Sequence, residues 1–125
     1  MRKATGLACD GVILDLEDGV SPPRKADARI AVFGALGLSF GPRERLLRMN
    51  ALSSPWGEDD LAALRGASVL PDTVVIPKVD TPEQVLAVAR ALEGQPVDLL
   101  PHIETARGLL AAAAIASCHP RVSGL

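Results

Sequence analysis

The chain has 125 residues, a formal net charge of -2 and 48% hydrophobic residues, a length and composition typical of one globular domain. The charge is nearly balanced and no basic run stands out, which argues against a nucleic-acid partner or a membrane surface. No apolar stretch is long enough to cross a bilayer. The two cysteines, Cys9 and Cys118, match no metal or redox spacing, so we expect reduced thiols in a cytoplasmic protein.

Apolar runs of strand length alternate with segments of helical periodicity. In chain order, the pattern predicts a strand over 11–16, a helix over 24–36, a strand over 45–49, a helix over 58–65, a strand over 73–79, a helix over 81–93, a strand over 97–103, a helix over 106–117 and the opening of a fifth strand over 121–125. The helix boundaries have local signals. Thr81 can cap its helix with Pro82 at the first position and Gln84 as capping-box partner, and Gly94 ends that helix.

Alternating strands and helices imply a parallel sheet, either doubly wound or closed into a barrel. The units repeat about every thirty residues, and each strand ends in polar residues. Barrel enzymes carry their catalytic residues at the carboxyl ends of the strands. We therefore expect an α/β fold in which residues 1–125 form a single partial domain, about four central units of a (β/α)₈ (TIM) barrel.

A polar pair closes each predicted strand, and side chains two residues apart in a strand share a face. The four pairs are Asp15 with Glu17, Arg48 with Asn50, Lys78 with Asp80, and His102 with Glu104. A single pair would suggest only a solvated strand end. Four pairs at the same end of four parallel strands predict one shared polar pocket.

The pocket residues suit the handling of an oxo acid. The carboxylates of Asp15, Glu17, Asp18 and Glu104 are the kind of oxygen ligands that Mg²⁺ prefers. Arg48 offers a planar fork that matches a substrate carboxylate. With the metal as Lewis acid, these groups could hold and polarise an oxo acid. Alternatively, Arg48 neutralises buried Asp15 or Glu17, and the two interpretations are compatible.

Other basic residues near the pocket leave alternatives open. Lys78 could form a Schiff base with a carbonyl substrate, but neighbouring carboxylates would keep it charged, which favours an ion pair with Asp80 or another pocket carboxylate. His102 is either a hydrogen-bonded structural histidine or an acid–base group. Lys25 and Arg29 could meet the phosphates of a bulky cofactor, although a solvated helix face is the favoured interpretation.

Five segments, in order, resemble the HpcH/HpaI aldolase and citrate lyase β-subunit family, closest to its citrate lyase-like, CoA-thioester-cleaving branch. The resemblance covers essentially the whole chain. The segments are DGVILDLEDGV at 10–20 with Pro23, Lys25, Ala28 and Arg29 after it, Arg48-Met49-Asn50, IPKV at 76–79, LPHIETARGL at 100–109 and RVSGL at 121–125.

The resemblance implies a TIM barrel that needs Mg²⁺ and makes or breaks a carbon–carbon bond. The implied reaction is reversible aldol or Claisen cleavage of a citryl- or malyl-type CoA thioester to an acyl-CoA and an oxo acid. By matching position, Glu104 would bind the metal, Arg48 would bind the oxo acid, and the acidic cluster would support the metal waters. The candidates are therefore Arg48, Asp15, Glu17 and Asp18 as catalytic residues, Arg48, Asn50 and Lys78 as substrate-binding residues, and Glu104 as metal ligand.

Family members are roughly twice as long, so the resemblance implies about four of the eight barrel units. An aspartate expected beyond Leu125 would be the second metal ligand. We expect little lyase activity from this chain alone, and association into a homo-oligomer through its open sheet edges. The alternatives are a non-catalytic remnant or interaction subunit that keeps the fold, and a Schiff-base aldolase that uses Lys78.

Overall fold

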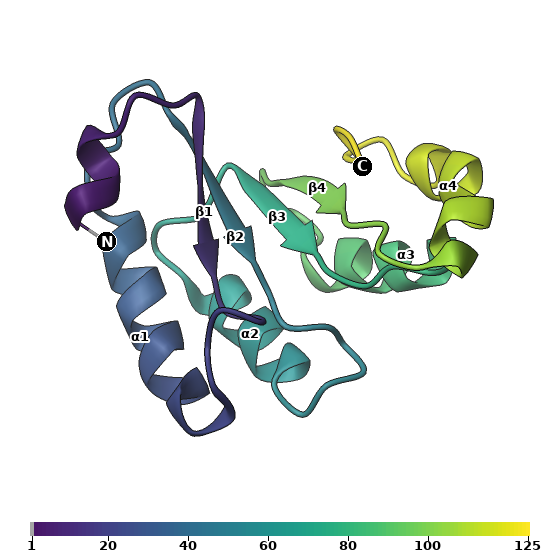
Figure 1. The fold of residues 1–125 in the computed structure, drawn as a ribbon, viewed down its shortest axis with the longest axis horizontal. Helices are drawn as coiled ribbons and strands as arrows, with labels where there is room; N and C mark the ends of the chain where they lie inside the picture. Colours follow the sequence, from purple (N-terminus) through teal and green to yellow (C-terminus); the bar gives the residue numbers. More distant parts are fainter. Residues whose placement is uncertain (1) are drawn as a thin grey trace.

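The computed structural model describes residues 2–125, with side chains from residue 4 onward. Four parallel strands form one sheet in the order β1-β2-β3-β4, and a helix follows each strand (Figure 1). In chain order the elements are η1 (Arg2–Gly6), β1 (Gly11–Asp15), η2 (Pro22–Arg24), α1 (Lys25–Leu36), β2 (Glu44–Arg48), α2 (Gly57–Gly66), β3 (Thr73–Ile76), α3 (Pro82–Ala91), β4 (Asp98–Pro101) and α4 (Ala106–Ser117).

The predicted elements are confirmed, with shorter third and fourth strands than expected. β3 ends at Ile76 because Pro77 has no N–H to donate to the ladder and Lys78 adopts a positive φ of 54°. In α3, Gln84 Oε1 accepts a hydrogen bond from the Thr81 N–H at 3.0 Å, which is the side-chain-to-backbone half of the expected capping box. α4 has the bounds that the periodicity predicts.

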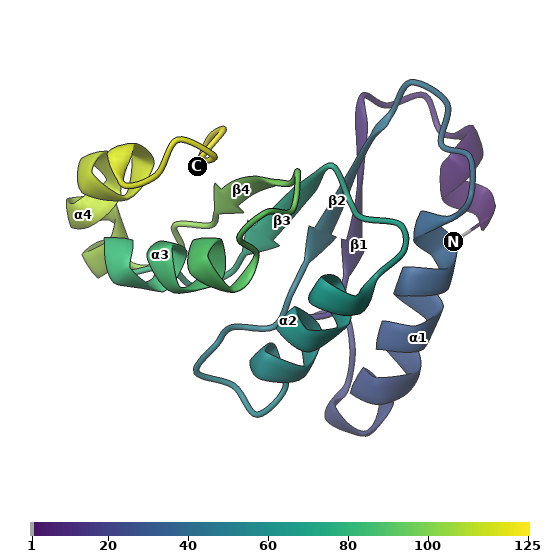
Figure 2. The ribbon, with the colours of Figure 1, turned by 180° about the vertical axis from the view of Figure 1, so that it is seen from behind.

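The strand order decides between the two expected sheet types. Every strand pairs with the next strand in the sequence, and parallel crossovers are almost always right-handed. When each right-handed crossover moves to the next strand in the same direction along the sheet, all the helices lie on one face, as in a barrel. In a doubly wound sheet the strand order reverses, and helices cover both faces. α2 and α3 lie behind the sheet in Figure 1 and in front of it in Figure 2. The chain therefore folds as part of a (β/α)₈ barrel.

The predicted fifth strand begins where the sequence places it. Val122 forms a parallel bridge with Leu99 in β4. The Leu99 N–H donates to the Arg121 carbonyl at 2.8 Å, and the Ser123 N–H donates to the Leu99 carbonyl at 3.1 Å. Among residues 2–125, no helix combines the length and the hydropathy that a membrane crossing requires.

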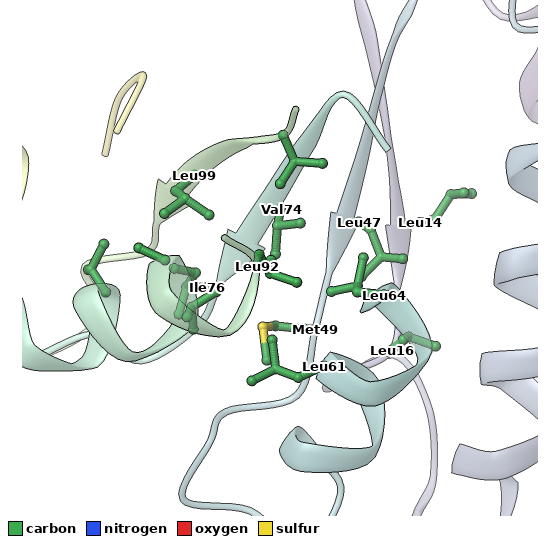
Figure 3. Close-up of a cluster of buried hydrophobic side chains, with 14 of the residues drawn as sticks. Leu14, Leu16, Leu47, Met49, Leu61, Leu64, Val74, Ile76, Leu92 and Leu99 are labelled. Atoms are coloured by element: carbon green, nitrogen blue, oxygen red, sulfur yellow. The ribbon is translucent and has the colours of Figure 1, made fainter. Parts of the chain in front are cut away.

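The hydrophobic core lies between the sheet and the helices (Figure 3). Alternate strand residues point into it, because strand side chains alternate between the two faces. These residues include Leu14, Leu47, Val74 and Leu99, all at most 5% exposed. The opposite face, which is the interior of a barrel, carries Ile13 at 49% exposure. The helix-facing layer thus anchors the strands, and their carboxyl ends share one rim.

Gly108 sets how closely α4 approaches the end of β3. A Cβ at Gly108 would lie 2.4 Å from the Val79 carbonyl oxygen, whereas a Cβ at Gly34, in α1, would meet nothing within 4 Å. We expect Gly108→Ala to lower the free energy of unfolding by roughly 1–3 kcal/mol through overpacking. Gly34→Ala should raise it by about 0.5–1 kcal/mol. Urea unfolding of both variants measures the difference, and equal effects would show that α4 is not closely docked at this point.

Candidate functional site

A charged pair joins the carboxyl ends of β1 and β2. Asp15 and Arg48 are register partners in the parallel ladder. Arg48 Nε donates to Asp15 Oδ1 at 2.8 Å, and Arg48 Nη2 donates to Asp15 Oδ2 at 2.6 Å. Arg48 Nη1 also lies 3.4 Å from Glu17 Oε2, so Asp15 and Glu17 do point the same way. The interpretation that Arg48 neutralises these carboxylates is confirmed, and the hydrogen bond with Asp15 raises the pKa of Arg48.

Asp15 also organises the loop that follows β1. Its Oδ1 accepts the Glu17 N–H at 2.8 Å, and its Oδ2 accepts the Gly19 N–H at 2.9 Å. Burial by itself would raise the pKa of Asp15, but the hydrogen bonds from Arg48, Glu17 and Gly19 outweigh it and lower the pKa. A Cβ on Gly19 would lie 2.6 Å from Asp15 Oδ2, so the close approach of this amide suits glycine.

Glu17 lies at the centre of the cluster. It is 4% exposed, and its Oε1 accepts a hydrogen bond from Lys78 Nζ at 2.5 Å. Lys78 Nζ also lies 3.2 Å from Asp18 Oδ1. Glu17 Oε2 is buried and accepts no hydrogen bond from the described residues, although Arg48 Nη1 lies 3.4 Å from it. The loop after β1 and the residues after β3 therefore meet here.

The partners of Lys78 narrow its possible roles. Its pKa is raised by the hydrogen bonds with Glu17 and Asp18, whereas Schiff-base formation needs a lowered lysine pKa. The expected ion pair with a pocket carboxylate is confirmed, with Glu17 and Asp18 as the partners, whereas Asp80 accepts a hydrogen bond from the Thr105 hydroxyl. Lys78 is thus an ion-paired lysine, which weakens the Schiff-base alternative.

Lys25 meets neither expectation: it is not on a solvated helix face, and it is not free to bind a phosphate. Lys25 is 6% exposed, so it lies on no solvated face. Its Nζ donates to the carbonyls of Leu16 and Glu17, both at 2.7 Å, and to Asn50 Oδ1 at 2.6 Å. These three bonds use all the donors of an ammonium group and leave none for a phosphate.

The two-residue alternation predicted that Asn50 and Arg48 share a face. The structure instead places them in different environments. β2 ends at Arg48, so the two-residue alternation does not extend to Asn50. The Asn50 N–H and Nδ2 donate to Asp60 Oδ2 at 2.8 and 2.7 Å, and Asn50 is 2% exposed. The proposed substrate-binding role of Asn50 stays a prediction, but its amide is already engaged.

Arg29 is also paired rather than solvated. Its Nε donates to Asp60 Oδ1 at 2.7 Å, and its Nη2 lies 3.4 Å from Asp59 Oδ2. Asp60 is 1% exposed. Asp60 has no sequence signal of burial, because an acidic residue in the first turn of a helix is an ordinary complement to the helix dipole.

Glu104 and His102 form a separate group after β4. Their side chains are 33% and 30% exposed, and His102 Nδ1 lies 3.7 Å from Glu104 Oε1. Both border an open depression of about 410 Å³, together with Leu109 and Leu125. Thr105 starts α4 by accepting the Gly108 N–H at 3.0 Å.

The residues present supply only part of a metal site. Within the described part of the chain, no group of three or more His, Cys, Asp or Glu side chains is placed to hold a metal ion. Glu104 is a partly exposed carboxylate, and Glu17 Oε2 is a buried oxygen that accepts no hydrogen bond from the described residues. Both are oxygen donors of the kind that Mg²⁺ takes, often through its waters. The rim therefore offers oxygen donors but no complete ligand set.

The Asp15–Arg48 pair should make stability depend on pH. Because the folded pKa of Asp15 is lowered from 3.8, its stabilisation is full above pH 3.8 and is lost as the pH falls through the folded value. We expect Asp15→Asn to cost roughly 1–3 kcal/mol at pH 7, with a smaller cost in acid. Urea unfolding between pH 7 and pH 3 measures this.

The matched control is Asp27→Asn, since Asp27 pairs with Arg24 on the surface, where the two side chains are 69% and 71% exposed. We expect that control to change little at either pH. An Asp15→Asn cost that stays constant down to pH 3 would contradict the assignment.

The sequence was compared with protein families and with known proteins. The HpcH/HpaI aldolase/citrate lyase family matches residues 1–125. A (3S)-malyl-CoA thioesterase of Cereibacter sphaeroides is 41% identical, over 100% of this chain and 42% of its own length. The human mitochondrial citramalyl-CoA lyase is 38% identical, over 88% of this chain and 35% of its own length. The chain therefore spans less than half the length of these relatives.

Solved structures agree with the fold. RipC from Yersinia pestis superposes with a TM-score of 0.83 at 31% identity, covering 97% of this chain and 53% of that chain. CitE from Mycobacterium tuberculosis, in complex with magnesium and acetate, gives a TM-score of 0.71 at 39% identity, covering 90% and 43%. From the family match over its whole length, the arrangement of its strands and these relatives, the chain belongs to the HpcH/HpaI aldolase/citrate lyase family.

Proposed function

We propose that the chain carries half of the site of a Mg²⁺-dependent carbon–carbon lyase that cleaves a hydroxyacyl-CoA thioester of the malyl or citramalyl type into an acyl-CoA and an oxo acid. The observation that carries the proposal is the Arg48 guanidinium, which Asp15 fixes beside Glu17 Oε2, a buried oxygen that accepts no hydrogen bond from the described residues. The names of the relatives, citramalyl-CoA lyase and malyl-CoA thioesterase, support a CoA-thioester substrate.

Arg48 is the proposed carboxylate-binding group. Its side chain is 24% exposed, and only Nε and Nη2 are used in the bidentate pair with Asp15. Nη1 lies 3.4 Å from Glu17, a distance at which an incoming carboxylate can compete for it. Asp15 keeps the guanidinium plane oriented, which lowers the entropic cost of binding a planar anion.

Glu17 is the proposed proton acceptor. In the cleavage direction, the substrate hydroxyl gives up its proton, its oxygen forms the carbonyl of the oxo acid, and the electron pair of the broken carbon–carbon bond passes to the acyl thioester as an enolate. Glu17 Oε2 is buried without a hydrogen-bond partner and can take that proton directly or through one water. Lys78 balances the charge at Oε1.

Mg²⁺ is the proposed cofactor, supported by the magnesium in the CitE structures of Mycobacterium tuberculosis. Glu104 is the residue of this chain that would hold it, together with ligands from the remainder of a complete barrel. When bound, the metal would polarise the oxygen that becomes the carbonyl of the oxo acid. Because the described residues form no complete ligand set and Glu104 is the one ligand proposed here, we expect weak metal binding and little turnover from this chain alone.

Thioester hydrolysis is the second candidate, because the Cereibacter sphaeroides relative is named a thioesterase. The two reactions break different bonds of the same substrate class. Lyase cleavage of malyl-CoA gives acetyl-CoA and glyoxylate, whereas hydrolysis gives free CoA and malate. Analysis of the products formed by a complete protein that contains this chain distinguishes them.

Calorimetric titration of the chain with Mg²⁺ and glyoxylate tests the proposed half-site. We expect binding of glyoxylate that strengthens with Mg²⁺ and falls at least about tenfold in Arg48→Gln, since a charged hydrogen-bonded pair contributes about 1.5–3 kcal/mol. Glu104→Gln should remove the dependence on Mg²⁺ and keep the weak binding to Arg48.

The matched controls are Arg90→Gln and Glu93→Gln, both at exposed positions of the third βα unit, and both should bind as wild type does. Equal binding by Arg48→Gln and wild type would reject Arg48 as the oxo-acid ligand. Folded wild type that binds nothing would support the alternative of a non-catalytic remnant.

Self-association is a further part of the proposal. Within residues 2–125, β2 is the one strand that pairs with β1, and α4 exposes Leu109 at 69% and Leu110 at 91%. Open edges and apolar helix faces favour association. We expect sedimentation velocity to show a dimer or larger species, and Leu109→Glu with Leu110→Glu to shift it toward monomer. Ile30→Glu, at a 76% exposed position on α1, is the control, and a monomer at every concentration would contradict the proposal.

A further inference from the structure

Lys25 is a buried ammonium group whose partners are neutral oxygens. It is 6% exposed, its Nζ donates to two carbonyls and one side-chain amide at 2.6–2.7 Å, and it lies 5.0 Å from the Trp56 ring centroid. A buried charge is tolerated only when its hydrogen bonds are complete. The surrounding backbone must therefore keep the positions that satisfy this ammonium group.

The Lys25 ammonium fixes the backbone on both sides of Glu17. The Glu17 N–H donates to Asp15 at 2.8 Å, and the Glu17 carbonyl accepts from Lys25 at 2.7 Å. The preceding carbonyl, of Leu16, also accepts from Lys25. With both of its backbone groups bonded, Glu17 has little freedom except at its side chain. Its carboxylate is thereby directed between Arg48 and Lys78.

The same ammonium group reaches the second βα loop. Asn50 accepts from Lys25 and donates twice to Asp60 at the start of α2. Arg29, one turn along α1 from Lys25, donates to the other oxygen of Asp60. α1 thus connects the loop after β1 to the loop after β2 through buried, mutually satisfied bonds, and such networks rigidify the groups they join.

We propose that Lys25 is a positioning residue of the rim: through the Glu17 backbone it sets the place of the Glu17 carboxylate between Arg48 and Lys78. The importance of that carboxylate in catalysis rests on the proposed function, but the positioning itself can be measured without any turnover. A failure of the lyase proposal and a failure of this one are therefore distinguishable.

The test follows the Lys78 ammonium group by nitrogen-15 NMR of Lys Nζ at neutral pH and low temperature. A hydrogen-bonded ammonium exchanges its protons slowly and gives a signal, which a Lys78→Gln variant assigns. We expect Lys25→Met, which keeps the length of the side chain, to stay folded by circular dichroism while the Lys78 signal broadens or disappears through faster exchange. Asn50→Ser, which removes one of three acceptors, should give a smaller change of the same kind and serves if Lys25→Met does not fold.

The matched control is Asp72→Asn, which breaks the Arg45–Asp72 pair of 2.7 Å near the amino ends of β2 and β3. It should destabilise the fold and leave the Lys78 signal unchanged. Rescue supplies the second readout. The rescue variant carries Lys25→Cys in a chain whose native cysteines are removed by Cys9→Ser and Cys118→Ala. Alkylation of the new cysteine with bromoethylamine, before refolding, gives a side chain that ends in an amine at the length of lysine. This side chain should restore the Lys78 signal. A Lys78 signal that is unchanged in folded Lys25→Met would overturn the proposal.

Discussion

The bidentate pair between Asp15 and Arg48 is the interaction on which the rim depends. The two residues face each other in the β1–β2 register, so the ladder itself brings them together. Each is partly buried, and neither charge is stable there alone. Asp15 uses its oxygens a second time, for the Glu17 and Gly19 amides. One carboxylate therefore fixes the guanidinium and the following loop, and a shift in strand register would lose both.

The charged residues form two layers that meet at Glu17. The outer layer, with Arg48 and Lys78, is partly open to solvent and leaves one Glu17 oxygen without a hydrogen-bond partner. The inner layer, with Lys25 and Asp60, is buried and fully bonded. The buried, satisfied network restricts the charged groups above it, because its own hydrogen bonds already fix the backbone from which they extend.

The fold explains why polar residues far apart in the sequence reach the same rim. Each βα unit of a barrel delivers its polar residues to the same rim, and each unit packs mainly on its neighbours in sequence. This chain spans less than half of its relatives' length, and its Glu104 stands apart from the Arg48 cluster with His102 beside it.

The order of elements, the parallel sheet and the polar rim follow from the amino-acid sequence alone, because hydrophobic periodicity and polar strand ends are local patterns. The contact of Arg48 with Asp15 and Glu17 could also be predicted from the sequence, because side chains two residues apart in a strand share a face and the parallel strands end at the same edge of the sheet. The partners of Lys25, Arg29 and Asn50 follow only from the folded arrangement. Arg29 and one bond of Lys25 reach residues of the second βα unit, and Asn50 is held by Asp60 in the first turn of α2. Sequence periodicity does not reveal these contacts, because it does not show which polar residues a neighbouring loop or helix will bury.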